Sequence, residues 1–367
     1  MKSTLLGVTL GTTLLAAAIA AAGAAQPSAK FNPLRVSLTA ATADSGGFLG
    51  AVEVVITNTG NRTVRVPKWE LPNEFLEAKL FQVTRDGAPV QYEGPMIKRG
   101  LPGAEDFAIL RAGESYRATV DLTAAYDMTQ SGRYVVTLIS PLQHASTSGG
   151  EMLKDIRGLP MLLQTAPLNL WVDGKDQLGA VQQAKPPKPD ASGVVVNGVT
   201  YKGCTTSRID TAGQAVNAAR NYAENGKGYL NAGTTGPRYT TWFGAYTSSR
   251  YSTARQHFAS IDTALDQNNG QITINCGCNQ SYYAYVYPNR PYEIFVCRAF
   301  WSAPLVGTDS KAGTLIHETS HFTVVAGTDD IVYGQAGAKN LALSDPNGAL
   351  NNADNHEYFA ENTPSQN

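Results

Sequence analysis

Charge of either sign is scarce in this chain of 367 residues. Asp, Glu, Lys and Arg together make up 16% of the residues, and the net charge is −1. Because a face that binds nucleic acid needs a surplus of Lys and Arg, this balance argues against a nucleic-acid partner. The length is sufficient for two domains with separate cores.

Cysteine is absent from residues 1–203, and the chain has four in all: Cys204, Cys276, Cys278 and Cys297. An even number in an exported chain favours two disulfides. One glycine separates Cys276 from Cys278, which is too tight for a comfortable bridge, so we expect each to pair outward. Of the three possible pairings we favour Cys204–Cys276 with Cys278–Cys297. A zinc cluster is the alternative, but the C-x-C spacing is shorter than usual for zinc.

The apolar run near the N-terminus predicts a secretion signal. Lys2 is followed by a stretch rich in Leu and Ala, which ends in the small residues 22–25. We therefore expect residues 1–25 to be a signal peptide cleaved after Ala25. A membrane anchor is the alternative, but the run is barely long enough and lacks a stop-transfer flank. A secreted protein without a stable membrane anchor is the prediction.

No sustained helical period occurs between residues 31 and 172. Residues 51–66, 115–122 and 132–140 instead alternate or run β-branched between clusters of turn residues, as strands do. We therefore predict an all-β domain over residues 26–172, of the immunoglobulin-like sandwich type but without a disulfide. Residues 173–199 contain a proline-rich polar stretch and are expected to form an exposed linker.

Residues 200–367 are predicted to form an α+β domain. Residues 211–230 and 252–267 have helical spacing of apolar residues, and strands are expected within 271–278 and 282–297. A third helix is expected from about Ser310 to Ala326. It can be capped by Thr308, Asp309 or Ser310 and is expected to end at Gly327.

This third helix carries the sequence HETSH, in which His317 and His321 lie one turn apart on one face. Two histidines at this spacing can bind zinc, and Glu318 can then act as general base on a water in the open position. The alternative is a chance match on an amphipathic helix. Catalytic zinc also needs a third protein ligand.

This sequence has neither a glutamate nor a histidine at the positions where the third ligand of such a zinc site commonly lies. Residues 335–356 contain no glutamate, and no histidine lies between His321 and His356. After Gly327 the chain can double back and bring a carboxylate to the metal. Spacing alone leaves both Asp329 and Asp330 open.

The stretch HETSHFTVVAGTDDIVYG, residues 317–334, resembles the signature of the aspzincins, the deuterolysin family of metalloendopeptidases. Their pattern is H-E-x-x-H followed by G-T-x-D-x-x-Y-G. The resemblance implies a zincin-type fold and one Zn²⁺ per catalytic domain, with Asp330 as the third ligand and Asp329 at the variable position. It also implies that Tyr333 donates a hydrogen bond to the oxyanion, although a tyrosine packed beneath the site is the alternative.

The resemblance spans residues 200–367 and is greatest to the peptidyl-Lys branch, which cuts on the amino side of lysine. The segments RYTTWFGAYTSSR, YAYVYPN and NADNHEYFAEN carry it. It implies the same two disulfides as favoured above, and a lysine pocket formed by Asp354 and Glu357. These two carboxylates lie three residues apart on one helix face, where a solvated acidic surface is the alternative. We assign His356 no role.

We therefore expect a secreted zinc endopeptidase that cleaves proteins and peptides before lysine. Because the resemblance begins only after the linker, the N-terminal domain is interpreted as a propeptide, acting as inhibitor or chaperone. Self-processing is predicted in the linker, at Lys175, Lys185 or Lys188. The alternatives are a deuterolysin of broader specificity, a permanent N-terminal binding module, and a non-enzymatic exported binding protein with a structural zinc site.

Overall fold

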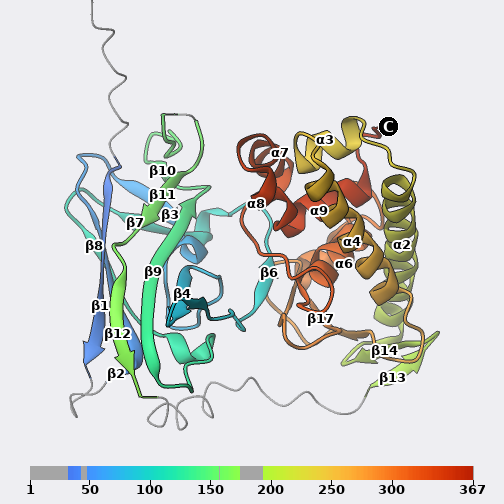
Figure 1. The fold of residues 1–367 in the computed structure, drawn as a ribbon, viewed down its shortest axis with the longest axis horizontal. Helices are drawn as coiled ribbons and strands as arrows, with labels where there is room; N and C mark the ends of the chain where they lie inside the picture. The colour runs from blue at the N-terminus through green and yellow to red at the C-terminus, as the bar shows by residue number, and fades with distance from the viewer. Residues whose placement is uncertain (1–31, 43–47, 157, 174–192, 367) are drawn as a thin grey trace, which may run out of the picture.

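The structure is a computed structural model that describes residues 32–42, 48–156, 158–173 and 193–366. The predicted signal peptide and most of the predicted linker, with its three lysines, lie outside these ranges. Figure 1 shows a half built of strands, blue to green, beside a half built mainly of helices, yellow to red. Among the described residues, no helix has both the length and the apolar character needed to span a bilayer.

The N-terminal half is β-rich, as predicted. In β9, alternate residues from Gly132 to Leu142 are buried, so one face of the strand packs into the core. Its sheets have the orders β1-β2-β8, β10-β3-β7 and β11-β9-β4-β5, with β12 also paired to β9. The strands are β1 Leu34–Thr42, β2 Phe48–Asn58, β3 Val64–Pro67, β4 Phe81–Arg85, β5 Ala88–Pro89, β6 Met96–Lys98, β7 Phe107–Leu110, β8 Ser115–Asp121, β9 Gly132–Leu142, β10 Ser146–Thr147, β11 Met161–Gln164 and β12 Leu168–Val172.

The C-terminal half combines helices with a sheet, which agrees with the predicted α+β class. The three predicted helices are present, and α6 packs between α2 and α9 with all 11 of its residues buried. The elements are β13 Val194–Val196, β14 Val199–Lys202, α2 Thr206–Asn231, α3 Pro237–Phe243, α4 Ser248–Leu265, β15 Thr273–Asn275, β16 Ala284–Val286, β17 Glu293–Val296, α5 Arg298–Ser302, α6 Lys311–His321, α7 Gly334–Ser344, α8 Pro346–Leu350 and α9 Ala353–Glu361.

One strand of the N-terminal half belongs to the sheet of the C-terminal half. The order of that sheet is β13-β14-β15-β17-β16-β6, and β6 comes from residues 96–98. It pairs antiparallel with β16, with Lys98 opposite Ala284 and Ile97 opposite Tyr285. Figure 1 shows β6 between the two halves. The sequence analysis did not predict this pairing.

The helix that carries the HETSH sequence is shorter than predicted. It was expected to reach Ala326, but α6 ends at His321. The chain then turns, with Gly327 at a φ of +61°, and the amide of Thr328 donates to the Ser320 carbonyl at 3.1 Å. A longer helix would carry this segment away from His321, so the early end is what returns the chain to the histidines.

The structure contains the disulfides Cys204–Cys276 and Cys278–Cys297, the pairing that the sequence analysis favours. The first joins the start of α2 to the segment after β15, and the second joins that segment to the start of α5. Both therefore lie within the C-terminal half and hold the strands of its sheet to the neighbouring helices.

Candidate active site

The buried helix α6 fixes two imidazoles side by side. Its N-terminus is capped by Ser310, whose hydroxyl accepts from the amide of Gly313 at 2.9 Å. His317 and His321 are fully buried, and their ring centroids lie 4.8 Å apart. Burial against neighbouring elements restricts both rings, so they form a preorganised pair.

The loop after α6 brings Asp330 to these histidines. Asn352 holds this loop: its side-chain oxygen accepts from the amides of Ile331 and Val332 at 2.8 and 3.1 Å. Although Asn352 precedes α9 and has the residue type of an N-cap, its side chain makes no capping bond. Its side chain instead supports the segment that follows Asp330.

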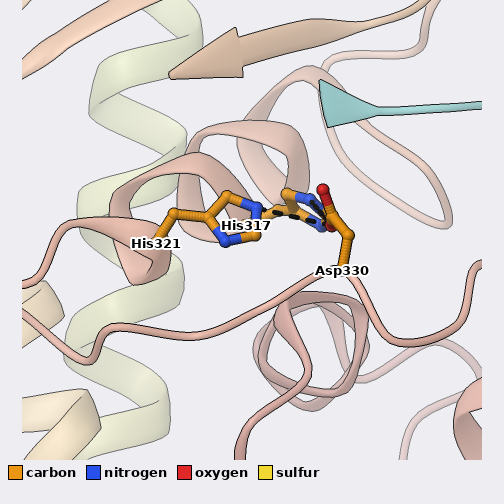
Figure 2. A group of neighbouring side chains, drawn as sticks. All are labelled: His317, His321 and Asp330. Carbon is orange, nitrogen blue, oxygen red and sulfur yellow. Dashed lines mark ion pairs between the residues drawn. The ribbon is translucent and has the colours of Figure 1, made fainter. Parts of the chain in front are cut away.

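The three atoms His317 Nε2, His321 Nε2 and Asp330 Oδ1 converge on one point, as Figure 2 shows. Asp330 Oδ1 lies 3.1 Å from the first nitrogen and 3.4 Å from the second. Ligand atoms in a tetrahedral zinc site lie about 3.3 Å apart, since each bond is about 2.0–2.1 Å. None of the three atoms has a hydrogen-bond partner among the described residues, although all are buried. The arrangement therefore fits zinc.

The other ring nitrogen of each histidine has a defined partner. His321 Nδ1 donates to the carbonyl of Thr328 at 2.8 Å, and His317 Nδ1 lies 2.8 Å from Oδ1 of Asp354. The hydrogen bond of His321 fixes its tautomer, and the ion-pair contact with Asp354 restrains the ring of His317, so each Nε2 is left to bind a metal. Burial by itself would raise the pKa of Asp330, but the two histidines lower it well below its usual value.

Glu318 follows His317 in the sequence, is fully buried, and interacts electrostatically with all three candidate metal ligands. Neither of its carboxylate oxygens has a hydrogen-bond partner among the described residues. Burial raises its pKa to about 7, although the neighbouring histidine charges oppose that rise. A carboxylate with a pKa near neutral pH is suited to accept and return a proton.

A lysine of the N-terminal half occupies the space between the two carboxylates of α9. Nζ of Lys98 lies 2.6 Å from Glu357 Oε2 and 3.6 Å from Asp354 Oδ1, and its side chain is 1% exposed. Burial by itself would lower the pKa of Lys98, but the surrounding carboxylates raise it well above its usual value. The pair predicted from sequence therefore lies together, around an ammonium group from the same chain.

The backbone beside Lys98 contacts two further predicted site residues. The hydroxyl of Tyr333 donates to the carbonyl of Ile97 at 2.9 Å, and the amide of Ile97 donates to Asp330 Oδ2 at 2.9 Å. The amide of Tyr283 in turn donates to the carbonyl of Lys98 at 3.0 Å. The peptide bond between Ile97 and Lys98 therefore lies against the candidate metal site.

Two more contacts join the halves near the same loop. Nζ of Lys79 lies 2.8 Å from both carboxylate oxygens of Asp329, the residue beside the candidate ligand. Gln143 pairs its side-chain amide with the backbone of Tyr333, and its oxygen accepts from the Tyr333 amide at 2.8 Å. Gln143 therefore holds the backbone of the same tyrosine whose hydroxyl contacts Ile97.

Comparison with protein families matches residues 229–361 to the aspzincin family, described as lysine-specific metallo-endopeptidase. The chain is also 45% identical over 318 residues to an extracellular protease of Aeromonas hydrophila, covering 86% of this chain and 89% of that protein. It belongs to the aspzincin family. This aspzincin is therefore a zinc metalloendopeptidase with a zincin-like catalytic domain, and the non-enzymatic interpretation was wrong.

Other relatives of this aspzincin differ in how much of the chain they share. It is 37% identical over 330 residues to a peptidyl-Lys metalloendopeptidase of Grifola frondosa, covering 86% of this chain and 88% of that protein. A peptidyl-Lys metalloendopeptidase of Pleurotus ostreatus is 49% identical over 168 residues, covering 45% of this chain and 98% of that protein. The alignment with the Grifola protein is longer than the predicted catalytic domain, so it extends into the N-terminal half. The expectation that the resemblance begins only after the linker was therefore wrong.

Sequence reasoning missed several residues of this site in the aspzincin. Three of them, Lys98, Lys79 and Gln143, lie in strands and loops of the N-terminal half, where no local sequence pattern distinguishes them from ordinary polar surface residues. Asn352 does have a sequence signal, but that signal predicts a helix cap and not support of the metal loop. These four depend on contacts between distant segments.

On α9, His356 forms a hydrogen-bonded pair with His257 of α4, so it has a structural partner, although the sequence analysis assigned it no role. His356 Nδ1 lies 3.0 Å from the carbonyl of Asn352, which only accepts, so its Nε2 is left to accept from His257 Nδ1 at 3.0 Å. Burial lowers the pKa of His257 to about 4 and that of His356 to about 3, so both imidazoles are neutral near pH 7.

Because these pKa values lie below that of a free histidine, acid should weaken the contribution of this pair to stability. Between about pH 6.5 and pH 4 the two histidines bind more protons in the unfolded chain than in the folded chain, so their contribution to the free energy of unfolding falls as pH is lowered. We expect the urea midpoint of the full chain to fall across this range, and to fall less steeply in His257→Gln. Equal slopes in the two proteins would contradict this assignment.

Proposed function

We propose that this aspzincin is a secreted endopeptidase that cleaves peptide bonds on the amino side of lysine, made as a precursor whose N-terminal domain blocks the site. The observation that carries the proposal is the position of Lys98. Its ammonium group lies between Asp354 and Glu357, while its backbone extends the sheet at β16. A lysine side chain thus fits the pocket, with the preceding peptide bond at the metal ligands.

In this proposal His317, His321 and Asp330 hold the zinc ion. When bound, zinc supplies Lewis acidity to the scissile carbonyl and to a water. Glu318 takes the proton from the attacking water and later delivers it to the leaving amine. The hydroxyl of Tyr333, which donates to the Ile97 carbonyl, is positioned to stabilise negative charge on a substrate carbonyl oxygen.

The lysine preference has two kinds of support. Asp354 and Glu357 are buried, and two buried carboxylates in contact are unfavourable without a cation between them. The relatives from Grifola frondosa and Pleurotus ostreatus are named peptidyl-Lys metalloendopeptidases. A broader specificity would require a pocket that tolerates a neutral side chain next to these two charges.

The N-terminal domain acts as a propeptide in this proposal. Addition of β6 to β16 resembles the way an extended peptide joins the exposed edge of a sheet. The Pleurotus relative is matched over 98% of its length by only 45% of this chain, which supports a working enzyme of about the size of the predicted catalytic domain. We interpret that domain as an immunoglobulin-like sandwich because β1 and β2 contact β12 across a shared core. The predicted signal peptide and linker complete the precursor.

The test is to digest a denatured protein with the enzyme after removal of the N-terminal domain, and to sequence the new N-termini. We expect lysine at nearly all of them, and no cleavage after treatment with a chelator. The intact precursor should be inactive in the same assay. Mixed residues at the new N-termini would favour a deuterolysin of broader specificity, and an active intact precursor would refute the blocking role.

A further inference from the structure

The ammonium group of Lys98 has a third acidic neighbour, which lies outside both sequence motifs. Oδ1 of Asp309 is 3.5 Å from Lys98 Nζ. Asp309 immediately precedes Ser310, the cap of α6, and its side chain is 42% exposed, whereas the two carboxylates on α9 are buried. Asp309 therefore lies at the solvent side of the pocket.

Asp354 has two other partners besides the lysine. Its Oδ1 lies 2.8 Å from Nδ1 of His317, and its Oδ2 accepts from the amide of Gly334 at 2.6 Å. The distance from Asp354 to the Lys98 ammonium, 3.6 Å, is longer than either contact. Asp354 thus orients a candidate metal ligand and the start of α7 as well as facing the lysine.

Asp309 is held in place by a hydrogen bond that does not involve the candidate metal ligands. The hydroxyl of Tyr358 donates to its Oδ1 at 2.7 Å. The rings of Tyr283 and Tyr358 also lie 5.2 and 5.9 Å from the Lys98 ammonium. Aromatic faces at such distances attract a cation. The outer part of the pocket therefore combines a carboxylate with two aromatic side chains.

We propose that Asp309 is a substrate-binding residue, the third carboxylate of the pocket for lysine, and that Asp354 both faces the lysine and acts as a positioning residue for His317. This inference rests on the proposed lysine preference. The ammonium of the substrate lies away from the reacting carbonyl, so Asp309 contacts it equally before and during the reaction. Loss of such an interaction raises KM and leaves kcat unchanged.

The experiment compares Asp309→Asn and Asp309→Ala with the unaltered enzyme on a short peptide with one lysine. Each is folded as the full chain and then freed from the N-terminal domain by the same added protease. We expect KM to rise about two- to fivefold, the range for a partly exposed ion pair, with kcat and zinc content unchanged. Asp210→Asn, an equal loss of charge at an exposed site on α2, should behave like the unaltered enzyme. In Asp354→Asn the zinc affinity should fall about 10- to 100-fold.

The outcomes separate this inference from the proposed function. If the unaltered enzyme releases products without N-terminal lysine, the lysine preference fails and the inference fails with it. If lysine is found but KM in the Asp309 variants equals that in Asp210→Asn, only the inference is overturned. A fall in kcat or zinc content with unchanged KM would likewise overturn it, because Asp309 would then have a structural role.

Discussion

Replacing Glu318 by Gln should lower kcat by about 10²- to 10⁴-fold, the usual contribution of a general base. The amide has nearly the same shape but cannot take a proton from water. Both carboxylate oxygens lack hydrogen-bond partners among the described residues, so the change removes no structural contact seen here. The measurement is kcat on a lysine peptide, with enzyme and variant freed from the N-terminal domain by the same added protease.

The zinc content of the Glu318→Gln enzyme distinguishes loss of the general base from loss of the metal. Glu318 is not one of the three converging ligand atoms, so Glu318→Gln should bind zinc like the unaltered enzyme. Glu224→Gln, which removes an exposed carboxylate on α2, should leave kcat unchanged. A Glu318→Gln enzyme that keeps more than about a tenth of the activity would show that another group is the base.

Replacing Lys98 by Met should unblock the precursor. Without the ammonium group, Asp354 and Glu357 are left buried and unpaired, and truncating one partner of a buried charge pair costs about 2–5 kcal/mol. Docking of the N-terminal domain should therefore weaken by about 30-fold or more. We expect the intact Lys98→Met chain to cleave a short lysine peptide at least about 30 times faster than the intact unaltered chain.

The matched control is Lys79→Met, since Lys79 also pairs with a carboxylate of the catalytic domain but is 38% exposed. Exposed ion pairs contribute about 0.2–1 kcal/mol, so its effect should not exceed about fivefold. Electrophoresis must show that each chain is intact during the assay. Equal activation by both variants, or none by Lys98→Met, would contradict a specific blocking role for Lys98.

The candidate metal site could be predicted because its parts are close in sequence. Helical spacing places His317 and His321 on one face, and the family pattern selects Asp330 where spacing alone leaves Asp329 open. The end of α6 was misplaced because Gly327 is a typical helix terminator, whereas the actual end depends on the return of Thr328 to His321. The local sequence pattern gives no information about that tertiary contact.

The domain arrangement was predictable only in outline. Strand alternation and cysteine distribution separate a β-rich half from a disulfide-bonded half. The insertion of Lys98 joins residues more than two hundred positions apart, and no local period or composition encodes such a pairing. A basic residue in a short strand looks like an ordinary surface residue until the partner carboxylates are placed beside it in space.

The pairing of β6 with β16 also bears on solubility. Without β6, β16 would lie at the edge of its sheet, with unpaired backbone groups on one side. Such an edge is a template for association with other chains, and natural proteins generally cover or interrupt it. The three residues of β6 cover this edge of the sheet, so in the proposed precursor they would limit aggregation at the same strand to which an extended substrate would later bind.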